Sequence, residues 1–294
     1  MLSLHTNASA LSTQNSLSST QKSLATSMTR LGTGYRVNSA MDDAAGLQIA
    51  TRLDSQTRGM AVAQRNTQNG ISMLQTGEGA LNEVSNILLR MKDLATEAYS
   101  ASSTATDKTA MQSEYDALGT ELNNIVRNTS FGGTQLFSDG TTVDGTNGKM
   151  SADMSFQIGA STGETMTVSL GTQLGTLATA LTNVSAKYAD PAATPALGEL
   201  EGATNAIIGT ISTAIDNVGS LRAAFGSAAN RLDHVYNNLQ NMSTNTAAAK
   251  GRIMDTDYAA ESSTMTTKQM LMQSGTAMLK QSNSMSGLVM SLLG

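Results

Sequence analysis

Residues 207–242 read IIGTISTAIDNVGSLRAAFGSAANRLDHVYNNLQNM, and this stretch decides the fold class. Its apolar residues recur at alternating steps of four and three, the heptad pattern of a helix that packs against a partner helix. They are Ile207, Ile211, Ala214, Val218, Leu221, Phe225, Ala228, Leu232, Val235, Leu239 and Met242. The pattern predicts one helix over residues 200–249, roughly 75 Å long at 1.5 Å per residue. A rod of that length is typical of a fibre or an elongated bundle, not of a compact enzyme.

Three further segments carry the same helical spacing. Residues 3–31 hold a narrow apolar stripe, and residues 42–99 hold a longer one with Gly59 and Gly70 as candidate break points. A third stripe runs from Met111 to Ile125. A last helix follows the 200–249 helix, which we expect to end at Gly251.

The helix starts are marked by polar side chains. Asn38 or Ser39 can cap the helix that begins near residue 42, with Asp42 and Asp43 in its first turn. Asp255 or Asp257 can cap the last helix. Capping explains these aspartates better than a cation site does, because both pairs lie where a helix should begin.

The middle of the chain has a different character. Residues 138–149 are mostly Gly, Asp, Asn, Ser and Thr, which favour turns. Apolar residues alternate with polar ones on both sides of Gly159–Gly163, which predicts a β-hairpin. Residues 174–200 are weakly patterned and contain both prolines, Pro191 and Pro195.

The predicted fold is therefore mainly α: an elongated antiparallel helical bundle or coiled coil of paired N- and C-terminal segments, with a small β-hairpin-containing insertion. Residues 1–33 can pair with 257–294, and residues 42–127 with 200–249. We expect three regions. They are a terminal coiled-coil domain of 1–41 and 250–294, a helical rod domain of 42–137 and 200–249, and an outward-facing hairpin region of 138–199.

Composition excludes several classes of function. The chain has 294 residues, a formal net charge of −5, no Cys, no Trp and 18 Met. No basic cluster is present, so we expect no nucleic-acid partner. No run of 18 apolar residues exists, so we expect no membrane insertion. The first residues lack the basic and apolar regions of a cleaved signal peptide.

Candidate catalytic and metal-binding residues are few. His5 and His234 are the only histidines, and they lie far apart in the sequence. A zinc site needs several ligands that converge, and HExxH is impossible here. We therefore expect no catalytic residues, no metal and no cofactor, and the middle region is too poor in chemistry to be an inserted enzyme.

At both ends the chain resembles the bacterial flagellins. The resemblance covers about residues 1–137 and 200–294, and its motifs are long and specific. They are LGTGYRVNSAMDDAAGLQIA over 31–50, NTQNGIS over 66–72, GSAANRL over 226–232, RIMDTDYAAE over 252–261 and the closing LLG over 292–294. Met41 departs from the family pattern, which usually has Lys there. The opening LHTN over 4–7 is similar to lateral-type flagellins, which drive swarming.

The resemblance implies a structural subunit that polymerises into the extracellular flagellar filament for swimming or swarming. The paired termini would form an inner coiled-coil layer, the longer helices a second layer, and the middle would face outward. The implied partners are further copies of the chain, the flagellar export apparatus and an export chaperone, the filament cap and hook-associated proteins. Export would follow the flagellar type III route without a cleaved signal peptide.

One alternative to the filament subunit remains, and the resemblance implies a receptor contact in addition. A hook–filament junction protein shares similar ends, although the continuous match through 66–72 and 226–232 favours a flagellin. Flagellins detected by Toll-like receptor 5 use a helix run similar to residues 89–95, so the resemblance also implies a receptor contact at Arg90, Leu94 and Glu114. Solvated helix charges are the simpler interpretation of Arg90 and Glu114.

The apolar columns at the two ends are the candidate polymerisation seam. The apolar stripe at each end is too narrow to form a core of its own. We therefore expect other copies of the chain to cover these stripes. The seam residues are Leu17, Leu24, Leu31, Leu271, Met278, Met285 and Leu292.

Overall fold

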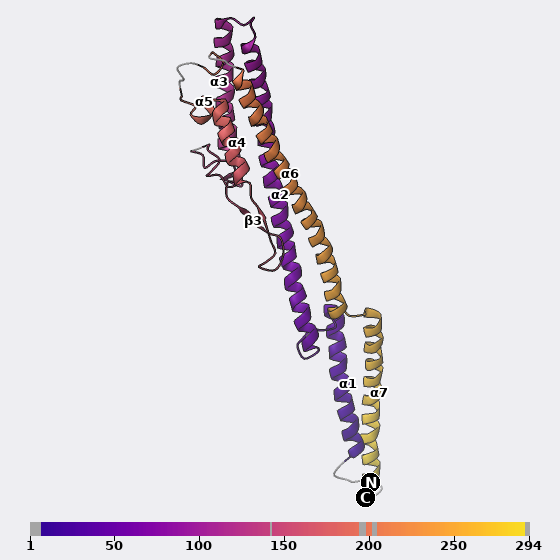
Figure 1. Ribbon diagram of the computed structural model, residues 1–294. Helices are drawn as coiled ribbons and strands as arrows, with labels where there is room; N and C mark the ends of the chain where they lie inside the picture. Colours follow the sequence, from indigo (N-terminus) through magenta and orange to yellow (C-terminus); the bar gives the residue numbers. More distant parts are fainter. Residues whose placement is uncertain (1–6, 142, 194–197, 202–204, 292–294) are drawn as a thin grey trace. The chain divides into compact units, whose positions relative to one another are not determined.

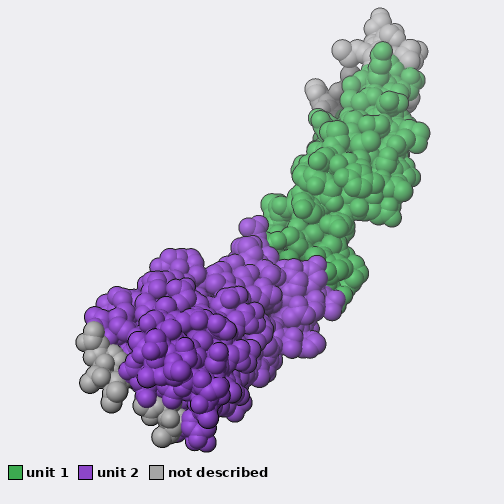
Figure 2. Space-filling model, turned by 90° about the horizontal axis from the view of Figure 1, so that it is seen from above, with its two compact units in different colours: residues 1–57, 244–294 green, residues 58–243 purple. Residues whose placement is uncertain are grey.

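The computed structural model describes residues 7–141, 143–193, 198–201 and 205–291, and it is mainly helical (Figure 1). The helices are α1 (Ala8–Thr33), α2 (Ala44–Tyr99), α3 (Ala105–Asn128), α4 (Gly171–Val184), α5 (Ala186–Ala189), α6 (Ala206–Met254) and α7 (Tyr258–Ser291). The strands are β1 (Ser130–Phe131), β2 (Thr134–Gln135), β3 (Met154–Gln157) and β4 (Thr165–Val168). Residues 1–57 and 244–294 form one compact unit, unit 1, and residues 58–243 form unit 2 (Figure 2).

In unit 2, α2 and α6 run antiparallel, as their contacts show. Arg222 pairs with Glu78 at 3.8 Å, and Gln64 donates a hydrogen bond to Gln240 at 3.1 Å. From the first contact to the second, the residue number on α6 rises from 222 to 240 while that on α2 falls from 78 to 64, so the two helices run in opposite directions. The predicted pairing of the long N- and C-terminal helices is confirmed.

The heptad seam of α6 is the core of unit 2. Ile211, Ala214, Val218, Leu221, Phe225, Ala228, Leu232 and Leu239 are all buried. At the far end Met242 is 36 % exposed. Ile207 and Val235 are half-buried. The pattern therefore predicted the buried face over most of its length, with complete burial at every seam position from Ile211 to Leu232.

The expected breaks at Gly59 and Gly70 were wrong, because α2 continues from Ala44 to Tyr99. A glycine inside a helix costs only about 1 kcal/mol relative to alanine, which neighbouring contacts can offset. A Cβ at Gly70 would lie 2.9 Å from the Phe156 ring, and one at Gly59 would lie 2.7 Å from Ala160 Cβ. Both glycines thus let the hairpin region approach the helix backbone.

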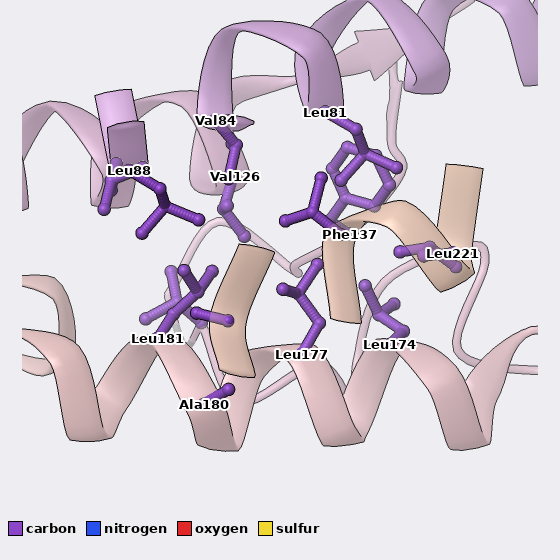
Figure 3. Packing of buried hydrophobic residues seen from close by; sticks show 14 of the residues in the cluster. Leu81, Val84, Leu88, Val126, Phe137, Leu174, Leu177, Ala180, Leu181 and Leu221 are labelled. Atoms are coloured by element: carbon purple, nitrogen blue, oxygen red, sulfur yellow. The ribbon is translucent and has the colours of Figure 1, made fainter. Parts of the chain in front are cut away.

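The predicted hairpin is confirmed as β3 and β4, which pair antiparallel with Met154 opposite Val168. A second small pair, β1 and β2, follows α3 directly. Helices α4 and α5 occupy part of the stretch that looked weakly patterned. Leu174, Leu177 and Leu181 of α4 point toward Leu81, Val84 and Leu88 of α2 and Leu221 of α6 (Figure 3).

In unit 1, α1 and α7 pair antiparallel, which confirms the predicted pairing of the two ends. Asn7 donates to the Ser282 carbonyl at 3.1 Å, and Arg30 pairs with Glu261 at 3.6 Å. Where α1 leads into α2, the chain also meets the end of α6. Arg36 N–H donates to the Met254 carbonyl and Thr256 N–H to the Gly34 carbonyl.

Two expected helix boundaries in unit 1 were wrong. Helix α6 continues past Gly251 to Met254, because the chain leaves the helix only where Asp255 pairs with Tyr35. Helix α2 begins after Asp43, whose Oδ1 accepts from Gly46 N–H at 2.8 Å. Asn38 and Ser39 instead donate their N–H groups to Asp42. Asp257 caps α7 by accepting from Ala259 and Ala260.

The start of α3 gives a pH-dependent prediction. Thr104 donates its hydroxyl and its N–H to Asp107, and these bonds lower the pKa of Asp107 below its usual value of 3.8. A depressed pKa contributes stability above about pH 4, and that stability is lost as the pH falls through the folded-state pKa. We expect Asp107→Asn to weaken the fall in melting temperature on acidification. Asp93→Asn, at an exposed position on α2, is the control and should keep the wild-type slope.

Candidate functional site

The contact between α1 and α7 is narrow and partly polar. Its α1 side consists of Ala10, Thr13, Leu17, Thr20, Leu24, Ser27 and Leu31, at steps of three and four. Its α7 side consists of Glu261, Met265, Lys268, Met272, Gly275, Leu279 and Ser282, at the same steps. On the described part of these helices, only Leu24 and Ser27 are buried. This pair therefore has very little apolar core.

Large apolar side chains remain on the outside of this helix pair. Met278 is 62 % exposed and Leu271 is 52 % exposed, and Leu11, Met28 and Met270 are also exposed. Full burial of a large apolar side chain gains about 1.5–3 kcal/mol, and each of these, being about half exposed, would gain roughly half of that by leaving water. A surface with this composition is typical of one that binds another molecule.

Two of these exposed side chains, Leu271 and Met278, line a shallow groove. It has a volume of about 290 Å³ and is lined by Ser12, Thr13, Ser16, Leu17, Thr20, Leu271, Ser274, Gly275 and Met278. Gly275 brings the helices together, because a Cβ there would lie 3.3 Å from Leu17 Cδ1. The groove has a small-residue floor with apolar side chains at its sides, a shape that fits an apolar side chain from another molecule. We call it the α1–α7 groove.

The candidate seam residues fall into three groups. Leu17, Leu271 and Met278 line the α1–α7 groove. Leu24 is buried and Leu31 is half-buried against α7, so they hold the pair together. Leu292 and the side chain of Met285 lie outside the described residues, as do His5 and most of the opening motif. The sequence analysis missed Ser274 and Gly275, although small residues beside an apolar column indicate close helix approach.

The three candidate receptor residues differ in their surroundings. Arg90 Nε donates to Glu114 Oε1 at 2.8 Å, and both side chains are about half exposed. Leu94 is only 2 % exposed and belongs to the core of unit 2. The structure thus brings Arg90 and Glu114 together on the surface and places Leu94 beneath it.

Two buried tyrosines stabilise the insertion, one by bonding it to α3 and the other by a bond within it. Tyr115 of α3 donates to the Val184 carbonyl at 2.7 Å, and Tyr188 of α5 donates to the Val143 carbonyl at 2.9 Å. Burial raises the pKa of both hydroxyls, so they stay protonated and act as donors. Their role is structural. Tyr115 belongs to the predicted stripe from Met111 to Ile125, whereas the sequence pattern did not single out Tyr188.

Other chemistry is sparse in the described part of the chain. His234 is exposed on α6, and no group of three His, Cys, Asp or Glu residues is arranged to hold a metal ion there. Among the described helices, none has an apolar stretch long enough to cross a membrane.

Comparison with known families decides the identity. Residues 4–142 match the bacterial flagellin N-terminal helical region, and residues 208–293 match the bacterial flagellin C-terminal helical region. The chain belongs to the bacterial flagellin family. It is therefore a structural subunit of the extracellular flagellar filament, which serves motility, and not an enzyme.

Individual flagellins match along the whole chain. Polar flagellin F of Vibrio parahaemolyticus serotype O3:K6 (strain RIMD 2210633) is 33 % identical, and the match covers 100 % of both chains. Flagellin A of Vibrio anguillarum is 34 % identical over 99 % of both. A crystal structure of Bacillus cereus flagellin is 35 % identical and covers 63 % of this chain and 94 % of its own, with a TM-score of 0.46.

Proposed function

We propose that the α1–α7 groove binds a second copy of this flagellin and that this contact builds the filament. The observation that carries the proposal is the exposure of Leu271 and Met278 beside Leu17 in one groove. Their own chain leaves them in water, and an apolar surface from another subunit would remove that cost. Met285 and Leu292 continue the same seven-residue spacing and would extend the contact.

The geometry of such a contact favours an open polymer. If the groove of one subunit takes a different surface of the next, the contact is heterologous. Repeating a heterologous contact whose rotation does not close generates a helical filament. Leu24 and Leu31 support this contact indirectly, because they hold α1 against α7 and so shape the groove.

The layered arrangement is part of the same proposal. Residues 1–41 and 250–294 would form the filament core, residues 42–137 and 200–249 the rod layer, and residues 138–199 the outer surface. A core position fits the terminal helices because they carry exposed apolar side chains. The turn between β3 and β4 is polar and exposed, which suits an outer position.

The specific partners follow from family membership as proposals. They are the flagellar export apparatus and an export chaperone, the filament cap and hook-associated proteins, with export of the unfolded chain. A lateral-type flagellum also remains a prediction. The exposed Arg90–Glu114 pair is the candidate contact for Toll-like receptor 5, with buried Leu94 supporting the helix beneath it.

Thiol labelling tests the groove and the layers together. The chain has no Cys, so a single introduced thiol reports on its own position. In Leu271→Cys, a maleimide should react readily with the introduced thiol in the free monomer. In the intact filament the same thiol should be protected and should react only after the filaments are dissolved in urea. In Thr162→Cys, which lies at an exposed position in the β3–β4 turn, the maleimide should react equally with the monomer and with the intact filament. Equal labelling of Leu271→Cys in monomer and intact filament would contradict the groove contact.

A further inference from the structure

We propose that Met278 is a site of reversible oxidation by peroxides, and that its sulfoxide blocks addition of the subunit to a filament. This inference rests on the proposed role of the α1–α7 groove. It adds a chemical modification that would act on that groove, with a peroxide as the oxidant and a methionine sulfoxide as the product.

The first observation is which oxidisable side chains the chain contains. The sequence holds 18 Met but no Cys and no Trp. A two-electron oxidant that reaches this protein therefore meets no thiol, and thioethers become its principal targets. Which thioethers react then depends on their exposure to solvent.

The second observation is how differently the two units expose their methionines. In unit 2, Met60, Met73, Met91, Met150, Met154 and Met166 are all buried and form the first group, while Met111 is half-buried and Met242 is 36 % exposed. In unit 1, Met28, Met41, Met270 and Met278 are all more than half exposed. A peroxide in solution should reach the second group and spare the first, so the fold of unit 2 would survive a treatment that modifies unit 1.

The third observation is the position of Met278 in particular. It lies at the α1–α7 groove with Leu17 and Leu271, and it is 62 % exposed in the single chain. Met41 is more exposed, at 97 %, but it lies in the connection between α1 and α2, away from the residues that line the groove. Oxidation at Met278 therefore changes the surface that the neighbouring subunit must cover.

The reaction balances without any further reagent. The Met278 sulfur uses a lone pair to attack one peroxide oxygen, the O–O bond breaks, and that oxygen remains on sulfur. The departing hydroxide takes the proton of the transferred oxygen and leaves as water. Sulfur is oxidised by two electrons and hydrogen peroxide is reduced by two, which gives methionine sulfoxide and water.

The product changes the energetics of assembly. A sulfoxide replaces an apolar thioether with a strongly polar S=O group. Burying that oxygen without a hydrogen-bond donor should weaken attachment to a filament end by about tenfold or more. A subunit already in a filament should be protected, because its neighbour covers the groove.

The test exposes monomer to hydrogen peroxide, maps oxidised methionines by peptide mass spectrometry and measures elongation of filament seeds. We expect Met278 to gain one oxygen and elongation to fall about tenfold or more. Met278→Leu should elongate normally after the same treatment. Met278→Gln, which resembles the sulfoxide in polarity, should elongate slowly without any oxidant.

Three controls give the result its meaning. Met41→Leu removes the most exposed thioether and should remain as sensitive to peroxide as the wild type. Methionine sulfoxide reductases supplied with a dithiol, which is oxidised to its disulfide as the sulfoxide oxygen leaves as water, should restore elongation of the treated wild type. Circular dichroism should show that treatment leaves the helices of unit 2 folded.

Two outcomes separate this inference from the proposed function. If Met278 stays unoxidised, or if Met278→Leu is inhibited as strongly as the wild type, the oxidation site is refuted. The groove contact still stands in that case, provided that a charge placed at Leu271 blocks assembly. If a charge at Leu271 has no effect, the groove contact and the oxidation site are both refuted.

Discussion

Leu271→Glu is expected to abolish filament growth while leaving the monomer folded. Leu271 is 52 % exposed and lines the α1–α7 groove beside Leu17 and Met278. A carboxylate there stays solvated in the monomer, so it costs the isolated chain little. In a filament the same carboxylate would be buried without a partner, which costs several kcal/mol per ion. Every subunit contact repeats that cost, so growth should stop altogether.

Seeded elongation followed by light scattering and electron microscopy measures this effect. Gln273→Glu is the matched control, because it adds the same charge to an exposed position on the same helix. At about 100° per residue, position 273 lies roughly 200° around the helix from position 271. We expect that variant to elongate. Normal filaments from Leu271→Glu would show that the groove is not a subunit contact.

Phe225→Ala should cause the largest loss of stability in unit 2. Phe225 is 1 % exposed and stacks on Phe137, with ring centroids 6.3 Å apart and planes 6° apart. Its ring also lies against α2 at Gly77, where a Cβ would come within 2.7 Å of the ring. Removing it leaves a cavity where α2, α6 and the insertion meet. The expected cost is about 3–5 kcal/mol of unfolding free energy.

Urea unfolding followed by circular dichroism gives that number. Leu89→Ala is the control, since Leu89 lies on α2 but is 49 % exposed. Its truncation should change the unfolding free energy by less than about 1 kcal/mol. Equal effects of the two substitutions would mean that the α6 seam does not hold unit 2 together.

The sequence predicted the parts of the fold in which burial is apolar and regular. From Ile211 to Leu232 every seam position of α6 is apolar and buried, so the heptad spacing alone gives the correct face. The β3–β4 hairpin was equally accessible, because Met154 and Val168 alternate with polar neighbours. In both cases the residue type and its burial agree.

Prediction was incomplete where the residue type and its burial disagree. The face that α7 turns to α1 includes Glu261, Lys268 and Ser282, while the apolar Leu271 and Met278 remain exposed. A pattern search follows apolar residues and therefore marks the groove rather than the helix contact.

Helix α4 was missed for a different reason. Its Gly and Thr residues obscured a signal that was present, since Leu174, Leu177, Ala178, Leu181 and Val184 recur at helical spacing and are buried. The helix boundaries at Asp43 and Met254 could not be read from spacing. The boundary at Asp43 depends on which of several neighbouring polar side chains accepts the Gly46 N–H bond. The boundary at Met254 depends on hydrogen bonds to Gly34 and Arg36, more than 200 residues away in the sequence.

The polar contact between α1 and α7 has a mechanical consequence. A helix pair held by few buried groups resists little when a force acts on either terminus. In an optical trap, pulling on the ends should first extend α1 and α7 at low force, one turn after another, without a sharp rupture. Unit 2, with its continuous apolar interior, should then give way abruptly at a much higher force.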